Sequence, residues 1–247
     1  MAVSTYTMSE AVSFEGVDPD ASEAWWWLGL PIAAAVAIMM TYLIAPDFYR
    51  ERVLPEAYGY LEISHIILPF IGFLVCLSVI SKPYVKARPF LMFSVAVFAL
   101  ACLYIAGEEC SWGQWIFYWS TPDFWAQLNA QQETNLHNTS YYFFQLPQTL
   151  LQFAIVIGGL LLPLSATLRN AVTNTMPSWA ILIPPLAIVP VSIMAVLFKI
   201  LDRVQKRDFV EDWLARPAEA TETFFYMFMM FYTIMLARRI RAQDHAS

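Results

Sequence analysis

Two pairs of glutamate and histidine residues have a spacing that places both side chains on one face of a helix. Glu62 and His65 are three residues apart, and Glu133 and His137 are four apart. Residues at either spacing are neighbours on a helix surface, so each pair presents a carboxylate and an imidazole together if its segment is helical. Glutamate oxygens and histidine nitrogens bind zinc, iron and manganese, which makes both pairs candidate metal ligands.

Further carboxylates accompany these pairs. Glu108 and Glu109 are adjacent, and Glu219 and Glu222 enter from the start of the last apolar stretch. A bound metal lowers the pKa of a coordinated water, and a neighbouring base accepts its proton as the water attacks an ester or amide. The predicted metal ligands are Glu62, His65, Glu109, Glu133 and His137, and the predicted catalytic bases are Glu108 and Glu222.

The spacing of Glu62 and His65 also occurs in four-helix di-iron proteins, where two Glu-x-x-His pairs join two further glutamates. This chain has one such pair, because the spacing of Glu133 and His137 is four rather than three. The match is therefore partial. Zinc, iron and manganese all stay open as the metal, and oxidation stays open beside hydrolysis as the reaction.

The composition is that of an integral membrane protein. Of 247 residues, 59% are hydrophobic and 14% are charged, with a mean hydropathy of +0.52. Soluble domains carry about a quarter charged residues. A helix needs about 20 mostly apolar residues to cross a membrane, and six stretches fit: 26–45, 61–80, 90–106, 147–166, 177–201 and 224–237. We therefore expect an all-α polytopic transmembrane bundle of about six helices.

Six spans place both termini on one side and the loops 46–60, 107–146 and 202–223 on the other. The candidate site residues all lie in or beside these loops, so we expect them at one membrane face. Residues 1–24 form an acidic N-terminal tail without Lys or Arg, which is not a signal peptide. Residues 25–238 form the membrane domain, in which Pro184, Pro185 and Pro190 predict a kink, and residues 239–247 form a C-terminal tail.

The segment 107–146 between the third and fourth spans is too polar to cross a membrane and unusually aromatic. Trp112, Trp115, Trp119 and Trp125 stand among polar residues there. Tryptophan favours the headgroup region, so we expect short interfacial or re-entrant helices. One of them should begin at 121–123, with the threonine as N-cap and the proline at the first helical position.

Location and orientation follow from charge. Lys and Arg are nearly balanced between the two sides, and the cluster Arg238, Arg239 and Arg241 after the last span places the termini in the cytoplasm. No basic stripe suggests nucleic acid as a partner. The expected partners are the lipid bilayer and either a lipid substrate or other subunits of a membrane complex.

Two segments resemble a motif of uncharacterised bacterial multispan membrane proteins. Residues 107–114 are GEECSWGQ and residues 129–138 are NAQQETNLHN, and the motif has the form GEE-x-SWGQ followed by N-x-Q-x-E-x-N-x-H-N. The resemblance implies a bacterial inner-membrane protein and does not imply a particular activity.

A looser similarity is to the alkaline ceramidase and progestin-receptor-like membrane hydrolases, which hold zinc at one membrane face. Glu133, Asn135 and His137 are similar to a Glu–Asn–His element of that group. This chain departs from the group because it has no late His-x-x-x-His pair and only two histidines before the C-terminal tail. A site with three histidines within one chain is therefore excluded.

These observations favour a membrane-embedded, metal-dependent enzyme that acts on a lipid or other apolar substrate at one membrane face. The alternative is a non-catalytic accessory subunit of a larger membrane complex, whose aromatic surface contacts a partner or a pigment. In that case Glu108, Glu109 and His137 form a structural hydrogen-bond cluster. A transporter is disfavoured, because no internal repeat is present and the polar residues do not lie at mid-membrane.

Overall fold

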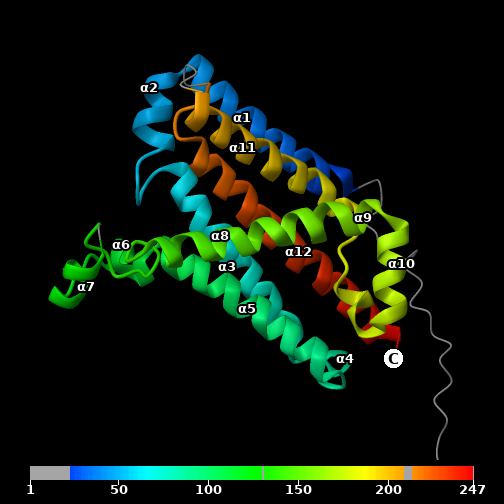
Figure 1. Ribbon diagram of the computed structural model, residues 1–247. Helices are drawn as coiled ribbons and strands as arrows, with labels where there is room; N and C mark the ends of the chain where they lie inside the picture. Colours follow the sequence, from blue (N-terminus) through cyan, green and yellow to red (C-terminus); the bar gives the residue numbers. More distant parts are fainter. Residues whose placement is uncertain (1–22, 130, 209–212, 247) are drawn as a thin grey trace, which may run out of the picture.

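All regular structure in the described residues is helical, as Figure 1 shows. The computed structural model describes residues 23–129, 131–208 and 213–246. Five helical segments are long and apolar enough to cross a membrane: Trp25–Ile44, Tyr60–Ile80, Pro89–Glu109, Tyr141–Leu164 and Pro217–His245. The expected all-α polytopic bundle is confirmed. Residues 1–22, most of the predicted acidic tail, lie outside the described residues.

The first half of the chain forms three crossings joined by short helical turns. The first crossing is η3 (Trp25–Gly29) and α1 (Leu30–Ile44), followed by the turns α2 (Pro46–Phe48) and η4 (Tyr49–Val53). The next two crossings are α3 (Tyr60–Ile80) and α5 (Pro89–Glu109), with α4 (Pro83–Lys86) between them. Proline begins α2, α4 and α5, where its missing N–H is not needed and its fixed φ suits the first turn.

The second half begins with the expected short helices. These are η5 (Ser111–Gly113), α6 (Gln114–Phe117) and α7 (Asp123–Leu128). The fourth crossing combines α8 (Tyr141–Phe153), η6 (Ala154–Leu161) and α9 (Leu162–Leu164), and α10 (Ala166–Thr175), η7 (Pro177–Leu182) and η8 (Leu186–Ile188) follow. The chain ends with α11 (Val189–Asp208) and α12 (Pro217–Ala246), so a helix runs through most of the predicted C-terminal tail.

The predicted span 177–201 differs from the observed structure. Two 3-10 turns and an extended stretch around Pro184 and Pro185 occupy its first half, so the prolines interrupt the helix rather than kink it. Regular helix begins at Val189 and continues to Asp208. α11 packs beside α12 in the bundle, but its C-terminal half is too charged for α11 to count among the five apolar spans.

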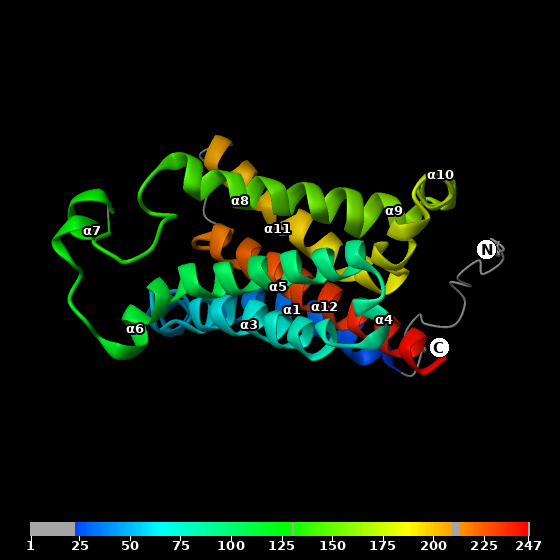
Figure 2. The same ribbon diagram turned by 90° about the horizontal axis from the view of Figure 1, so that it is seen from below.

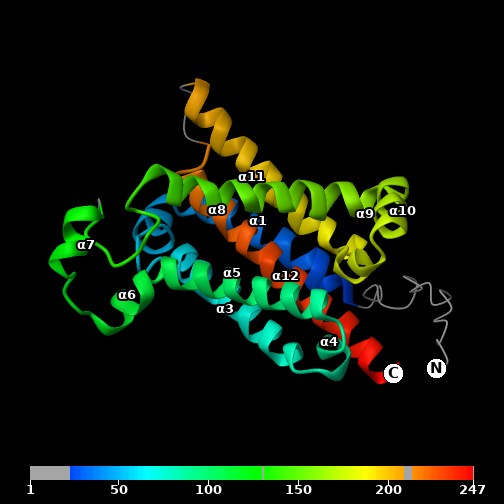
Figure 3. The same ribbon diagram turned by 60° about the horizontal axis from the view of Figure 1, so that its bottom comes forward.

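α12 is the centre of the bundle. In Figures 1 and 3 it lies between α1 and α11 on one side and α3 and α5 on the other. It packs directly against α3 and α11, and Phe224, Phe228 and Phe231 are buried along it. A helix that is apolar all round belongs in a core, which explains why this stretch carries aromatic and methionine side chains on every face.

α3, α5 and α12 approach one another closely at Gly72. A Cβ atom at this position would lie 3.0 Å from Cys102 Sγ on α5 and 3.2 Å from Thr233 Oγ1 on α12. Small residues permit such close packing of membrane helices. These three helices therefore form the rigid unit that carries the candidate site at one of its ends.

The two ends of the bundle differ in what they hold. The start of α1 and the end of α12 lie at one end, as Figure 2 shows, where Arg238 pairs with Glu23 and Lys82 with Asp244. The turns α2, α6 and α7 lie at the opposite end. The starts of α3 and α12 and the end of α5 are also there, so the predicted site residues share that end.

Candidate functional site

An acidic cavity of about 260 Å³ opens between the starts of α3 and α12, the end of α5 and the loop 131–138. Its basic lining side chains are Arg216 and His137. Its acidic lining side chains are Glu56, Glu62, Glu108, Glu109, Glu133, Glu219 and Glu222. The acidic cavity thus brings together every predicted site residue except His65, which is fully buried against α12.

The hydrogen bonds of His65 define its tautomer. Nε2 lies 3.0 Å from the carbonyl oxygen of Glu219 and 2.9 Å from Thr223 Oγ1. A carbonyl only accepts, and the Thr223 hydroxyl already donates to the same Glu219 carbonyl at 3.1 Å. Nε2 must therefore carry the hydrogen. In the neutral ring Nδ1 then has a free lone pair.

His65 Nδ1 has no hydrogen-bond partner among the described residues, although it is buried. It faces Glu109 Oε2 at a distance of 3.7 Å. A neutral Nδ1 and a carboxylate oxygen both offer lone pairs and do not attract each other. The two atoms therefore need a hydrogen or a cation between them: a proton on the Glu109 carboxyl group, a second proton on the ring, or a metal ion.

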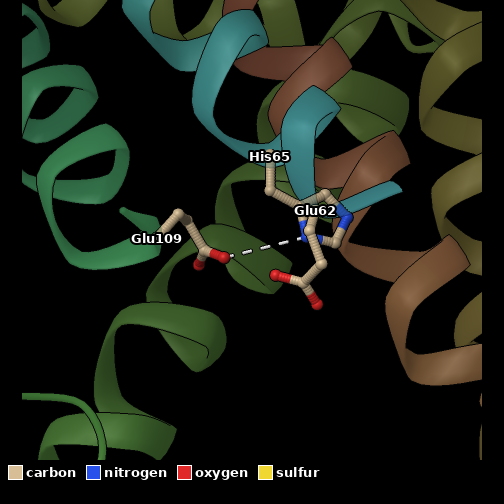
Figure 4. Close-up of side chains that lie close together, drawn as sticks. All are labelled: Glu62, His65 and Glu109. Carbon is tan, nitrogen blue, oxygen red and sulfur yellow. Dashed lines mark ion pairs between the residues drawn. The ribbon is translucent and has the colours of Figure 1, made fainter. Parts of the chain in front are cut away.

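Glu62 completes a three-residue group with His65 and Glu109. One ligand atom from each of the three lies within 4.8 Å of the others. In Figure 4 the three side chains point toward one another, two from α3 and one from α5. Two ligands that are each about 2.1 Å from a tetrahedral ion are about 3.4 Å apart. The group, called the helix-end cluster below, therefore needs to close by only a small distance to hold an ion.

α12 adds two more carboxylates beside this cluster. Glu219 and Glu222 form a second group with His65, again with one ligand atom each within 4.8 Å. Glu219 also accepts a hydrogen bond from Arg216 at 2.5 Å, and Glu222 accepts one from Gln148 at 2.7 Å. Arg216 thus partly neutralises one of these two carboxylates.

Tyr226 lies one turn further along α12 and fixes the position of Glu109. Its hydroxyl donates to Glu109 Oε1 at 2.7 Å, while its ring contacts the His65 ring edge-to-face at a centroid distance of 5.3 Å. One oxygen of Glu109 is therefore engaged, and the other is the oxygen that faces His65.

Glu108 has a different environment from its neighbour Glu109. Its Oε1 accepts from Trp112 Nε1 at 2.7 Å, and its Oε2 accepts from the backbone N–H groups of Leu136 and His137 at 2.7 and 2.8 Å. The residue is 3% exposed. Glu108 joins the end of α5 to the loop 131–138, and its oxygens are already occupied by donors.

Glu133 is the centre of a second hydrogen-bond network in that loop. Its Oε2 accepts from Ser111 Oγ at 3.0 Å and from Asn135 Nδ2 at 2.6 Å. Thr134 donates from its backbone N–H to Gln114 Oε1 at 2.8 Å. The segments 107–114 and 129–138 therefore bind each other. We call this interlocked set of Glu108, Ser111, Gln114, Glu133, Thr134, Asn135 and His137 the loop cluster.

His137 belongs to the loop cluster rather than to the helix-end cluster. Its Nδ1 lies 3.5 Å from Glu108 Oε2. Burial alone would lower the pKa of His137, but the contact with Glu108 and the nearby charges of Glu109 and Glu133 outweigh burial and raise this pKa above its ordinary value. The imidazolium form is therefore favoured beside the Glu108 carboxylate.

The structure separates the predicted ligands into two sets. Glu62, His65 and Glu109 converge as expected, whereas neither three-residue group contains Glu133 or His137. The segment that holds Glu133 and His137 is not helical, so the two side chains do not share a helix face. α7 begins at Asp123 with Pro122 at the N-cap, and Thr121 bonds instead with Gln114 and Gln132.

Three side chains of α12 to which the sequence alone assigns no role belong to the site, although Glu219 is among the carboxylates expected beside it. Glu219, Thr223 and Tyr226 contact the helix-end cluster, and with Glu222 they follow a spacing of three or four residues. That spacing places them on one helix face, so the signal was present in the sequence.

A comparison with protein-family models, curated proteins and solved structures found no match to the chain.

Proposed function

We propose that this protein is a membrane-embedded, metal-dependent hydrolase that cleaves an ester or amide of an apolar substrate at one membrane face. The observation that carries the proposal is His65 Nδ1, a buried lone pair without a hydrogen-bond partner in the described chain, aimed at Glu109 with Glu62 beside it. A histidine that binds a metal usually donates its other N–H to a carbonyl or carboxylate. His65 Nε2 does this toward the Glu219 carbonyl.

Glu62, His65 and Glu109 supply one nitrogen and two or more oxygens to the ion. This mixed donor set suits zinc, iron or manganese, and an absence of thiolates disfavours softer metals. Cys110 is near in sequence, but its Sγ donates to the Gly107 carbonyl at 3.5 Å. The open side of the acidic cavity leaves room for a water and a substrate.

An ion held by Glu62, His65 and Glu109 would lower the pKa of a bound water, and Glu222 would accept one proton from that water. The water oxygen forms a bond to the carbonyl carbon of the ester or amide. The bond from that carbon to the leaving oxygen or nitrogen then breaks, and the proton passes from Glu222 to the leaving group. Glu222 is suited to this because it lies beside His65 and lines the cavity.

Glu108 has a positioning role in this proposal rather than the role of a base. Three donors occupy its carboxylate, so a proton transfer would break the bonds that hold the loop 131–138. The loop in turn places His137 and Gln131 at the wall of the cavity. Glu108 therefore acts on the substrate site through the loop.

The experiment is to purify the protein in detergent and to measure bound metals by inductively coupled plasma mass spectrometry. We expect about one zinc, iron or manganese ion per chain in the wild type and a large loss in Glu62→Gln and in Glu109→Gln. Glu51→Gln, a change of an exposed glutamate outside the cavity, is the matched control and should retain the metal. Gel filtration should show that all variants stay folded.

A wild-type protein that is folded and free of metal after growth with each of the three metals would overturn the proposal. In that case a proton between His65 Nδ1 and Glu109 Oε2 satisfies both atoms. If the wild type does bind a metal, it should be incubated with fatty esters and fatty amides beside Glu222→Gln, which should keep the metal and lose hydrolysis.

A second candidate function, an accessory subunit of a membrane complex, is favoured by one observation. The short helices and the start of α8 expose several large aromatic side chains: Phe117 at 73%, Tyr118 at 84%, Phe124 at 67%, Tyr141 at 73% and Tyr142 at 80%. Contiguous exposed apolar surface marks a contact with lipid or with a partner. Chemical cross-linking in native membranes tests this candidate, because a subunit gives a defined heteromeric adduct.

A further inference from the structure

A second and larger cavity of about 730 Å³ lies beside the acidic cavity and deeper along the bundle. It is bounded by α5, the fourth crossing α8–η6–α9, η7 and α12, and apolar side chains make up nearly all of its wall. Two of its polar groups are already paired: the Tyr232 hydroxyl donates to the Leu182 carbonyl and Thr233 Oγ1 to the Met230 carbonyl, each at 2.9 Å. We call it the apolar cavity.

The two cavities are adjacent and share part of their wall. Tyr104, Ile105 and Pro147 line both of them. A ligand that passes this boundary moves from a wall of carboxylates to a wall of hydrocarbon side chains. This order of surfaces matches an amphiphile with its polar end at the helix-end cluster and its hydrocarbon chain in the apolar cavity.

We infer that the apolar cavity binds one hydrocarbon chain of the substrate, and that the polar end of this substrate carries no net negative charge. The inference rests on the proposed function for the reaction, but the chain site can be tested without it. A volume of about 300 to 1,000 Å³ is typical of specific ligand pockets, and the apolar cavity lies in that range.

The charge of the acidic cavity supports the second half of the inference. Among the described residues, seven glutamates, one arginine and one histidine line this cavity, so acidic groups stay in excess even with one divalent ion bound. A phosphate or a sulfate at the polar end would meet this excess at close range and be repelled. A neutral or cationic headgroup, such as an alcohol, an amide or an amine, avoids that repulsion.

Small residues in the wall of the apolar cavity allow a test of how long a hydrocarbon chain it accepts. Ala101 precedes Tyr104 by three residues on α5, which is about 5 Å along a helix. Gly158 follows Pro147 by eleven residues on the fourth crossing, which is about 16 Å. A Cβ atom added at Gly158 would meet only Pro184 Cγ at 4.0 Å, so a side chain can begin there without a clash.

The test uses a fatty-acid 2-hydroxyethyl amide with a photoreactive diazirine at the end of its chain, cross-linked to the full-length protein in detergent and mapped by peptide mass spectrometry. We expect cross-links in the wall of the apolar cavity, around Ile157, Trp179 and Tyr232. An unlabelled choline ester of the same chain should compete, and lysophosphatidic acid, which is anionic, should not.

Two filling variants and one control make the test specific. Gly158→Leu should reduce cross-linking by long chains several-fold and leave short chains unaffected, whereas Ala101→Phe should reduce both. Ala37→Phe on the exposed face of α1 is the matched control and should change neither. Gel filtration identifies any variant that does not fold, and Gly158→Leu alone suffices if Ala101→Phe fails.

Cross-links spread evenly over the outer faces of the helices, or equal competition by the anionic lipid, would overturn the inference. The metal content of the same preparations separates this inference from the proposed function. If the preparation contains metal but its cross-links are scattered over the outer faces, only the hydrocarbon-chain site is refuted. Cross-links in the apolar cavity without any metal support the chain site and refute the hydrolase.

Discussion

The helix-end cluster and the loop cluster both contain two glutamates and a histidine but differ in how their polar groups are satisfied. In the loop cluster Glu108 and Glu133 accept hydrogen bonds from neighbouring donors, and His137 lies beside Glu108. In the helix-end cluster His65 Nδ1 is buried without a hydrogen-bond partner in the described residues. A satisfied network fixes a structure, whereas a buried lone pair beside carboxylates leaves a place for a cation.

Adjacent residues show the difference most clearly. Glu108 and Glu109 follow each other at the end of α5, yet Glu108 points to the loop and Glu109 to α3 and α12. Successive residues of a helix are about 100° apart around its axis, so each faces a different neighbour. The first therefore organises the loop, and the second belongs to the proposed metal site.

The largest stability effect is expected for Glu108→Ala. The change removes the acceptor of the Trp112 indole and of the N–H groups of Leu136 and His137, all partly buried, and a hydrogen bond to a charged group contributes about 1.5–3 kcal/mol. We expect a loss of about 3 kcal/mol or more in unfolding free energy. Thermal unfolding can be followed with a thiol-reactive dye, because Cys76, Cys102 and Cys110 are buried in the fold. A change no larger than that of Glu51→Gln would contradict the role of Glu108.

Gly107→Ala is expected to destabilise the loop cluster through overpacking. A Cβ atom would lie 2.9 Å from the Trp112 ring, which the hydrogen bond to Glu108 holds in place. Such overpacking costs about 1–3 kcal/mol. The thermal midpoint should fall in the same dye assay. In Glu108→Gln, which weakens the hold on Trp112, the same glycine substitution should cost less, and equal costs in both backgrounds would refute the coupling.

Thr223→Val is expected to lower the affinity for the metal and leave the fold intact. Thr223 accepts from His65 Nε2, and loss of such an outer partner lowers metal affinity about 10–100-fold. The Glu219 carbonyl still accepts from His65, which favours the lower part of that range. Titration with a competing chelator measures the affinity. Thr221→Val is the control, because Thr221 is equally buried on α12 but donates only to the Pro217 carbonyl.

The smallest predicted effect is a dependence of stability on pH in the loop cluster. The folded-state pKa of His137 is raised, so protonated His137 stabilises the fold fully below its unfolded pKa of about 6.5, and this contribution is lost as the pH rises through the folded pKa. The wild type should therefore lose stability, relative to His137→Gln, between pH 6 and pH 8. Thermal midpoints of both proteins at the two pH values test this sign.

Most of the bundle could be predicted from the sequence, because membrane helices are apolar over about 20 residues. Such a stretch can be recognised without knowing which helices it packs against. The sequence also predicted that Glu62 and His65 share a face, since this follows from helix periodicity alone. The structure of residues 177–201 was harder to predict, because hydropathy does not show that consecutive prolines interrupt the helix before Val189.

Which of the predicted site residues lie together was only partly predictable from the sequence. Glu133 and His137 were paired on the assumption of a helix, but Asn129 and Asn135 bond to each other and to the backbone and hold that segment in a turn-rich loop. The contribution of Thr223 and Tyr226 depends on α12 packing against α3, which no local pattern reports. Which polar group stays without a partner, as His65 Nδ1 does, is a property of the assembled bundle.

The most direct test of the account is the metal content of His65→Ala compared with His137→Ala, both purified in detergent beside the wild type. If the helix-end cluster binds the metal, the wild type and His137→Ala should contain stoichiometric zinc, iron or manganese, and His65→Ala should have lost it. Loss in both variants would show that the loop cluster also binds the ion. Retention of the metal in a folded His65→Ala would contradict the assignment of the metal to the helix-end cluster.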